Sequence, residues 1–194
     1  MQLKRLFTTS GAKGSENYLN TQKKYEILRT MLYFAVSAAL FIAGYLQTGN
    51  RENLLTIVAV LGCLPASKSA VSAIMFLRFH SCSAEAAGKI REHSQGFSQL
   101  FDCVFTSYKK NYRVSHLVVR AGTVCGFTED AAFEENEFYK YINDILKLDG
   151  HKNITVKIFG SLSKYAERLE QLKELEDDEA KSRAVLETLK NVML

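Results

Sequence analysis

The residues best suited to chemistry in this sequence are its histidines and cysteines, and their spacing forms no familiar site. The four histidines are scattered, at His80, His93, His116 and His151. The four cysteines include no Cys-x-x-Cys pair and stand at Cys63, Cys82, Cys103 and Cys125. A structural zinc site needs paired ligands in a tetrahedral set. We therefore expect no bound metal, and cysteines that are small buried hydrophobes in a reducing compartment.

Acidic, nucleophilic and glycine-rich patterns are no more informative. Glu129-Asp130 and Glu134-Glu135 precede a helical pattern, where carboxylates suit the positive end of the helix dipole, so we interpret them as capping groups. His116 falls in a β-prone run and is expected to be a core or edge residue rather than a general base. No GxGxxG or Walker pattern occurs, which argues against a phosphate-binding loop. The sequence therefore predicts a protein that is not an enzyme and holds no cofactor.

The helices and strands that must position these residues follow from the way apolar and charged residues are separated along the chain. Residues 30–48 and 54–77 are long apolar runs, and the second contains a single charged residue, Lys68. A helix that crosses a bilayer needs about 20 mainly apolar residues. Each run meets that length. A cleaved signal peptide has a shorter apolar core near the terminus, so we expect two transmembrane helices. A buried hairpin of a soluble protein is the alternative.

The orientation of these helices follows from their short connection and their flanking cations. Only five residues, 49–53, separate the two runs, which predicts an antiparallel hairpin. Lys and Arg residues gather before the first run and after the second, whereas the turn offers Arg51 alone. Because cations collect on the cytoplasmic side, we predict a multi-pass protein of the cell membrane with both termini in the cytoplasm. The modest net charge of +4 is explained by this topology, so no nucleic acid is expected as a partner.

Two features of the predicted spans are candidates for function or packing. Lys68 is an ionisable residue within a span, which suggests a functional site. Alternatively, its long side chain extends to the inner boundary or meets a backbone carbonyl near Pro65. Small residues also recur at helical spacing and would let helices approach closely, within the hairpin or between copies. These packing candidates are Ala35, Ala39, Ala43, Ala59, Cys63, Ala66 and Ala70.

The last part of the chain reads as a cytoplasmic α/β (α+β) domain. Alternating apolar residues predict a strand over 100–108, with Phe101, Cys103 and Phe105 on one face. Two further strands and close turns predict an antiparallel meander. An amphipathic helix over 131–148 is expected to bury Phe138, Tyr141, Ile142, Ile145 and Leu148. The complete order is α-β-β-β-α-β-α-α. The expected domains are a partly mobile cytoplasmic segment 1–29, transmembrane helices 30–48 and 54–77, and the α/β domain 83–194.

Residues 83–160 resemble the α-βββ-α-β core of restriction-endonuclease-like folds, most closely the nuclease-related domain. Tyr112–Val119 is similar to the second core strand of that family, in which an aspartate is followed by histidine and apolar residues. In this chain Ser115 stands at the aspartate position. The third strand of the family carries an acidic residue and a lysine, and Thr123–Thr128 has neither. The resemblance therefore implies this fold without its metal-binding catalytic residues.

Three functions are compatible with these features. The first is a membrane protein whose non-catalytic cytoplasmic domain binds an unidentified protein partner or assembles as a homo-oligomer. The second is a small oligomeric membrane effector or channel that the cytoplasmic domain gates, which Lys68 suggests. The third is a membrane-anchored enzyme with an unrecognised site. In each case the lipid bilayer is an expected partner.

Overall fold

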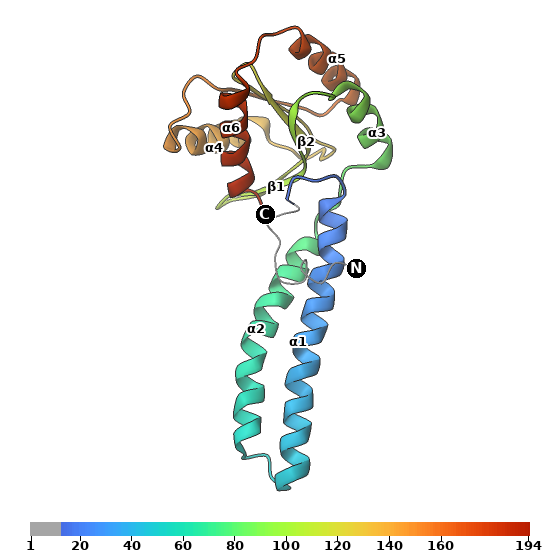
Figure 1. Ribbon diagram of the computed structural model, residues 1–194, viewed down its shortest axis with the longest axis vertical. Helices are drawn as coiled ribbons and strands as arrows, with labels where there is room; N and C mark the ends of the chain where they lie inside the picture. Colours follow the sequence, from blue (N-terminus) through green and yellow to red (C-terminus); the bar gives the residue numbers. More distant parts are fainter. Residues whose placement is uncertain (1–12) are drawn as a thin grey trace. The chain divides into compact units, whose positions relative to one another are not determined.

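A computed structural model describes residues 13–194, and it contains the elements in the order expected from the sequence. Two long apolar helices are followed by a mixed four-stranded α/β domain (Figure 1). The described residues divide into two compact units, one built on residues 19–80 and the other on residues 13–18 and 81–194. Each unit is described by itself.

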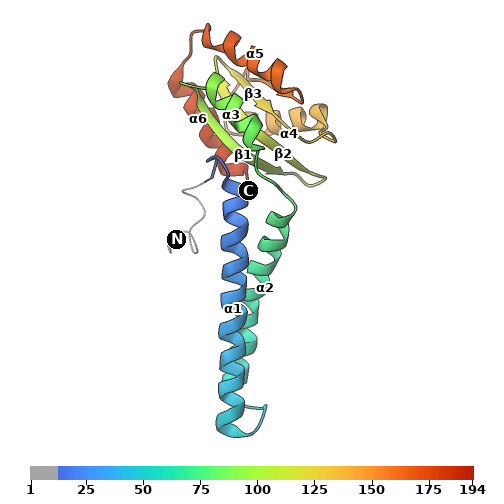
Figure 2. The same cartoon turned by 90° about the vertical axis from the view of Figure 1, so that its right-hand side faces the viewer.

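The first unit is a helical hairpin made of α1 (Tyr18–Thr48) and α2 (Leu54–Leu77), which run antiparallel side by side (Figures 1 and 2). The charged stretch that precedes the first apolar run belongs to the same helix as that run. Asn53 caps α2, because its side-chain oxygen accepts a hydrogen bond from the Thr56 backbone N–H at 2.9 Å. The Asn53 side-chain amide also donates to Thr48 Oγ1 at 3.1 Å, which ties the two ends of the turn together.

The two helices meet along small residues and leave most of their apolar surface uncovered. A Cβ atom at Gly62 would lie 2.6 Å from Ser37 Oγ, so any larger residue would force the Ser37 side chain or the helices to shift. A Cβ atom at Gly44 would lie 2.8 Å from Leu55 Cβ on α2. Only 11% of the most apolar segment of α1 and 17% of that of α2 is buried. Both helices are long and apolar enough to cross a membrane.

The second unit is built on a four-stranded sheet in the order β1-β2-β3-β4. Its strands are β1 (Ser98–Thr106), β2 (Asn111–Arg120), β3 (Thr123–Phe127) and β4 (Thr155–Phe159). The first three form the expected antiparallel meander, and β4 pairs parallel with β3. A parallel neighbour requires a crossover connection, which α4 (Glu135–Leu148) supplies.

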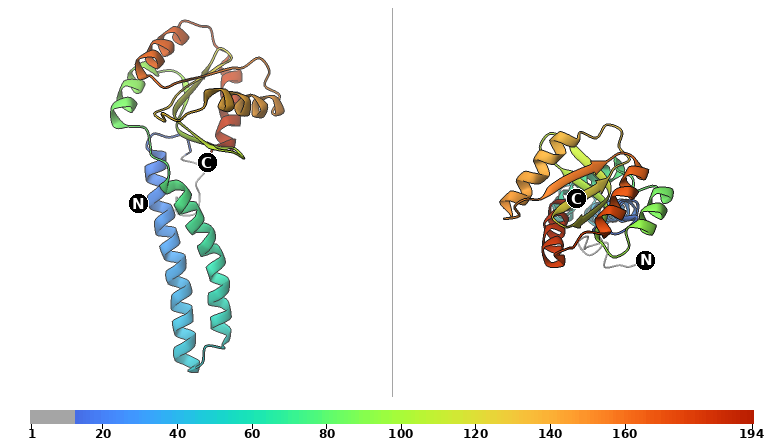
Figure 3. Two further views of the ribbon diagram at one scale, coloured as in Figure 1. Left: turned by 180° about the vertical axis from the view of Figure 1, so that it is seen from behind. Right: turned by 90° about the horizontal axis from the view of Figure 1, so that it is seen from above.

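Helices cover both faces of this sheet (Figure 3). On one face, α4 and α6 (Glu179–Val192) pack over a core that includes Phe105, Leu117 and Phe138. On the other face, α3 (Ala84–His93) and α5 (Leu162–Lys173) pack over Phe101, Val118 and Tyr165. Because both faces are buried, the central strands are apolar on both sides rather than alternating. The acidic stretch 174–178 separates α5 from α6.

An irregularity in the pairing of β1 with β2 makes one sequence expectation wrong. Phe101, Cys103 and Phe105 do not share a face, because Phe101 packs with α3 and α5 whereas Cys103 and Phe105 pack with α4 and α6. The change of face occurs at Asp102, which adopts a left-handed conformation with φ of 52°. Asp102 and the facing Ser115 are both left out of the pairing of β1 with β2, and the register is the same on either side of them. The alternation of side chains therefore shifts in both strands at this point.

The buried face of α4 also differs from the expected one. Phe138, Ile142 and Leu146 are fully buried, whereas Leu148 is 89% exposed. Leu148 is the last residue of the helix, and Asp149 and Gly150 follow it.

Part of the segment expected to precede the membrane belongs to the α/β domain. The Gly14 carbonyl accepts a hydrogen bond from the Phe101 backbone N–H at 2.9 Å, and Arg91 Nη2 lies 2.7 Å from Glu16 Oε1. The expectation that residues 1–29 are partly mobile includes residues 1–12, which lie outside the described residues.

Candidate functional site

The ionisable residue of the second apolar helix, Lys68, lies on its exposed side beside a buried polar contact. Its neighbour Ser69 is buried against α1, where Arg29 Nε donates to Ser69 Oγ at 3.2 Å. The Ser69 hydroxyl is also 2.9 Å from Thr30 Oγ1. These two contacts place Lys68 at the level of Arg29 and Thr30, where the uninterrupted apolar stretch of α1 begins.

Arg29 belongs to a polar network on α1 that the sequence analysis did not identify. Its guanidinium pairs with the carboxylate of Glu26, and Glu26 Oε1 accepts from Gln22 Nε2 at 3.0 Å. Gln22 and Glu26 are both buried. These three residues are spaced by four and three positions, which puts them on one face of a helix. This spacing is the feature of the sequence from which the network could have been predicted. The network supplies hydrogen-bond and ion-pair partners to polar side chains at the level where the apolar part of the hairpin ends and its charged part begins.

The small residues chosen as packing candidates are divided between the interior and the exterior of the hairpin. On α2, Ala59 and Ala66 are buried and Ala70 is half-buried. Cys63 is exposed, as are Ala35, Ala39 and Ala43 on α1. The α1 residues that contact α2 include Ser37 and Gly44 instead. The series on α1 therefore does not form the contact within the hairpin, and its role between copies stays a prediction.

In the α/β domain, Ser115 on β2 contacts a carboxylate that holds a helix start. Its hydroxyl donates to Glu129 Oε2 at 3.2 Å. The same oxygen accepts from the Ser83 backbone N–H at 3.2 Å, and Ser83 is the N-cap of α3. Glu129 therefore stabilises the beginning of α3, whereas the sequence suggested a role at the beginning of α4. Carboxylates favour this position because the first N–H groups of a helix are unpaired and positive.

Asp102, at the irregular position of β1, is a second carboxylate that the sequence analysis missed. It is buried, and its Oδ1 accepts from the Cys82 backbone N–H at 2.8 Å. Burial raises the pKa of the Cys82 thiol to about 12, and the charges of Glu129 and Asp102 add to that effect. At neutral pH Cys82 is therefore a neutral thiol, which is a poor nucleophile and metal ligand. The available signal was an aspartate within an otherwise apolar strand.

The arrangement around Ser115 suits a structural role better than metal chemistry. Asp102 and Glu129 already accept hydrogen bonds from backbone N–H groups at the start of α3. Within residues 13–194, no group of three or more His, Cys, Asp or Glu side chains is placed to hold a metal ion. On β3, burial raises the pKa of the Cys125 thiol to about 12, so this residue also stays neutral.

His116 is fully buried and both of its ring nitrogens are hydrogen-bonded. Nε2 donates to Gln99 Oε1 at 2.8 Å, and the Tyr165 hydroxyl donates to Nδ1 at 2.7 Å. This assignment is consistent because Gln99 Oε1 can only accept, and burial keeps the pKa of Tyr165 well above its usual value. Burial also lowers the pKa of His116 to about 3. His116 is therefore a neutral core residue, as the sequence suggested.

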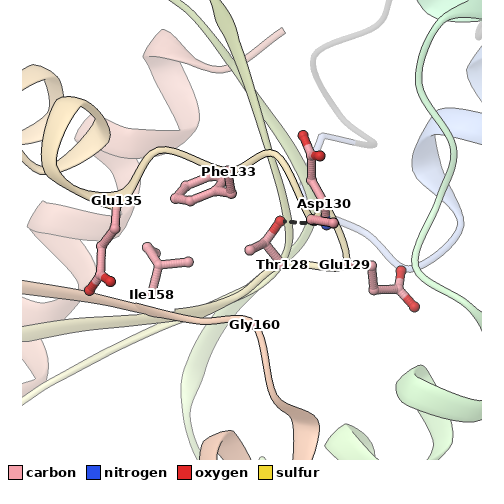
Figure 4. Close-up of a pocket in the computed structure, with 8 residues that line it drawn as sticks. Thr128, Glu129, Asp130, Phe133, Glu135, Ile158 and Gly160 are labelled. Atoms are coloured by element: carbon pink, nitrogen blue, oxygen red, sulfur yellow. Dashed lines mark hydrogen bonds between the residues drawn. The ribbon is translucent and has the colours of Figure 1, made fainter.

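A cleft of about 300 Å³ opens where β3 and β4 end (Figure 4). Ile158 and Phe133 point into it, and the carboxylates of Asp130 and Glu135 lie at its rim, as Figure 4 shows. The full lining consists of Thr128, Glu129, Asp130, Ala131, Phe133, Glu135, Ile158 and Gly160. The carboxyl ends of parallel strands are a common location for binding sites in α/β folds. Its acidic rim favours a cationic group.

Comparisons with known proteins identify no relative of this chain. No protein-family model matches it, and neither a curated protein nor a solved structure does. The resemblance to restriction-endonuclease-like folds therefore stays a prediction from the sequence.

Proposed function

We propose that this chain is a two-pass membrane protein that holds a non-catalytic α/β domain at the cytoplasmic face of the membrane. The observation that carries the proposal is the uncovered apolar surface of the hairpin. Large side chains such as Leu46, Leu54 and Leu64 are more than two-thirds exposed, although water disfavours such surface. An antiparallel hairpin of this length has its apolar surface solvated by lipid tails.

The charges of the hairpin support an orientation. Its open end carries Lys23, Lys24, Arg29 and Arg78, whereas its turn carries Arg51 beside Glu52. Cytoplasmic flanks are rich in Lys and Arg, so the open end and both connected segments belong on that side. The α/β domain continues directly from His80 and thus belongs on the same side.

The contact between Arg29 and Ser69 supports a boundary for the bilayer core. From Thr30 to Thr48, α1 rises about 27 Å, close to the thickness of the hydrocarbon core. Lys68 stands at the inner end of this span, level with Arg29, and its flexible side chain reaches the headgroups. This position favours an interfacial residue over a residue that lines a channel.

A binding role rather than a catalytic one is supported by the polar side chains of the domain, which are already hydrogen-bonded within it. Both ring nitrogens of His116 are hydrogen-bonded, and Asp102 and Glu129 hold the start of α3. A catalytic base or nucleophile must be free to meet a substrate. The domain offers an acidic cleft and an open strand edge for a protein partner or for self-assembly.

Membrane integration is tested by washing membranes that contain the full chain with alkaline carbonate, which removes peripheral proteins. We expect the chain to remain in the membrane pellet. Val60→Arg puts a charge near the middle of the proposed bilayer core, where it costs about 3 kcal/mol, and should reduce the pelleted fraction. Leu77→Arg, on the same helix at the cytoplasmic end, is the matched control and should have little effect. Release of the unmodified chain into the supernatant would overturn the proposal.

A further inference from the structure

The two outer edges of the sheet differ in whether other backbone segments hydrogen-bond to them. The edge of β1 is occupied, because the Gly14 carbonyl accepts from Phe101 and the Leu194 N–H donates to the Val104 carbonyl at 2.8 Å. At the opposite edge, β4 pairs with β3 alone among the strands of residues 13–194. An open strand edge is a template for another strand.

The hydrogen bonds of β4 show which of its groups face outward. The Thr155 N–H donates to the Gly122 carbonyl at 3.0 Å, and the Phe159 carbonyl accepts from the Thr128 N–H at 2.9 Å. Main-chain groups alternate in direction along a strand, so Thr155 and Phe159 face β3. Val156 and Ile158 therefore direct their N–H and carbonyl groups away from the sheet.

The side chains of β4 leave this edge accessible. Ile154, Val156 and Ile158 are buried in the core beneath α4. Lys157 projects from the other face, where its ammonium lies 5.2 Å from the centre of the Phe159 ring. Its charge is thus held over its own strand by a cation–π contact.

Opposite charges mark the two ends of the same strand. The acidic cleft, with Asp130 and Glu135 at its rim, lies at the end of β4 beside Ile158 and Gly160 (Figure 4). The exposed cation Lys152 precedes the beginning of β4. Pairing two copies of β4 antiparallel brings the beginning of each strand next to the end of the other. The arrangement is therefore complementary to itself under two-fold symmetry.

We propose that β4 is a homodimer interface at which it pairs antiparallel with β4 of a second copy of the chain. Val156 lies opposite Val156 of the partner subunit, and Lys157 lies opposite Thr155 of the partner subunit, which avoids the repulsion of two facing lysines. Lys152 of the partner subunit then approaches the acidic cleft. The inference names the partner in the proposed function and rests on that proposal.

Disulfide cross-linking of the full chain in detergent micelles tests the register. In the proposed register, exposed Thr155 faces exposed Lys157 of the second copy in a non-hydrogen-bonded pair, whose Cα atoms are about 4.5 Å apart, within the range of a disulfide. In a Cys63→Ala background, the double variant with Thr155→Cys and Lys157→Cys should form a covalent dimer under mild oxidation. Tyr108→Cys, in the fully exposed turn after β1, controls for random collision. We expect the double variant to cross-link about tenfold more, a difference of about 1.4 kcal/mol in association. Equal cross-linking would overturn the register.

A charge exchange on exposed residues tests the interface without altering the core. Like charges at an interface strongly disfavour association. Lys152→Glu and Glu135→Lys should each raise the dimer dissociation constant by about tenfold or more, measured by native mass spectrometry. The double variant restores opposite charges and should return it to within about threefold of the unmodified chain. Single variants that dimerise normally, or a double variant that remains monomeric, would overturn the proposal.

The two proposals fail in distinguishable ways. A chain that stays in carbonate-washed membranes but is monomeric in native mass spectrometry overturns β4 pairing and leaves the membrane anchor intact. A chain that carbonate extracts, yet dimerises with the expected charge dependence, overturns the anchor and leaves the interface.

Discussion

Arg29 and Ser69 join the two long helices at one level, where Arg29 Nε donates to Ser69 Oγ at 3.2 Å. Thr30 meets the same hydroxyl, and Arg29 also pairs with Glu26. This relationship sets the register of the hairpin and brings Lys68 level with Arg29, where we propose that the bilayer core ends.

Ser69→Ala should lower the stability of the hairpin by about 1–2 kcal/mol, because Arg29 and Thr30 both lose a buried partner. Ser67→Ala is the matched control. Ser67 is exposed and donates to the Cys63 carbonyl of its own helix, so its loss should cost less than about 0.5 kcal/mol. Thermal unfolding of the full chain in detergent measures both variants. Equal effects would show that the contact does not hold the two helices together.

The depth of Lys68 is measurable because the chain contains no tryptophan. Lys68→Trp and Leu61→Trp introduce a probe at two exposed positions of α2, and the second lies about 10 Å deeper along the helix axis. In vesicles with lipids brominated at chosen depths, the Leu61 variant should be quenched most by deep bromines and the Lys68 variant by shallow ones. A probe at position 68 quenched as deeply as one at position 61 would contradict the interfacial placement.

Lowering the pH should destabilise the α/β domain through His116. Its pKa of about 3 in the folded state lies below its ordinary value of about 6.5, so only the unfolded state takes up a proton between these pH values. The contribution of His116 is fully present above pH 6.5 or so, and falls by about 1.4 kcal/mol per pH unit on acidification toward pH 3. Urea unfolding at several pH values measures the slope. His116→Gln should remove about one proton from it, and an unchanged slope would refute the assignment.

Tyr165→Phe should cost about 1–3 kcal/mol, because it leaves Nδ1 of the buried His116 without a donor. Tyr141→Phe is the matched control, since the Tyr141 hydroxyl donates to the Thr106 carbonyl in a setting that water can reach. The control should lose less than about 1 kcal/mol. Urea unfolding compares the two variants, and similar losses would indicate that the Tyr165 hydroxyl does not satisfy the histidine.

The architecture could be predicted from the sequence where the signal is local and repeated. The length of the two apolar runs predicts both long helices, and the short turns between strands predict the meander of β1, β2 and β3. The three buried residues Tyr165, Leu169 and Leu172 of α5 follow from their helical spacing. These features depend on neighbours in the chain.

Features that depend on tertiary contacts were missed. The left-handed conformation of Asp102 accompanies the change of face between Phe101 and Cys103, and no residue type in β1 predicts that conformation. Glu129 is next to α4 in sequence but holds the start of α3, because β3 ends beside that helix. Ser37 and Gly44, not the alanine series of α1, contact α2, since close approach of the helices decides that face.

The most direct test of the membrane topology is cysteine labelling in intact cells. In a Cys63→Ala background, Asn50→Cys marks the turn of the hairpin and Tyr108→Cys marks the α/β domain. A maleimide that cannot cross the membrane should label position 50 in intact cells and position 108 only after the membrane is permeabilised. Labelling of position 108 in intact cells, or protection of position 50 until permeabilisation, would contradict a two-pass anchor with a cytoplasmic domain.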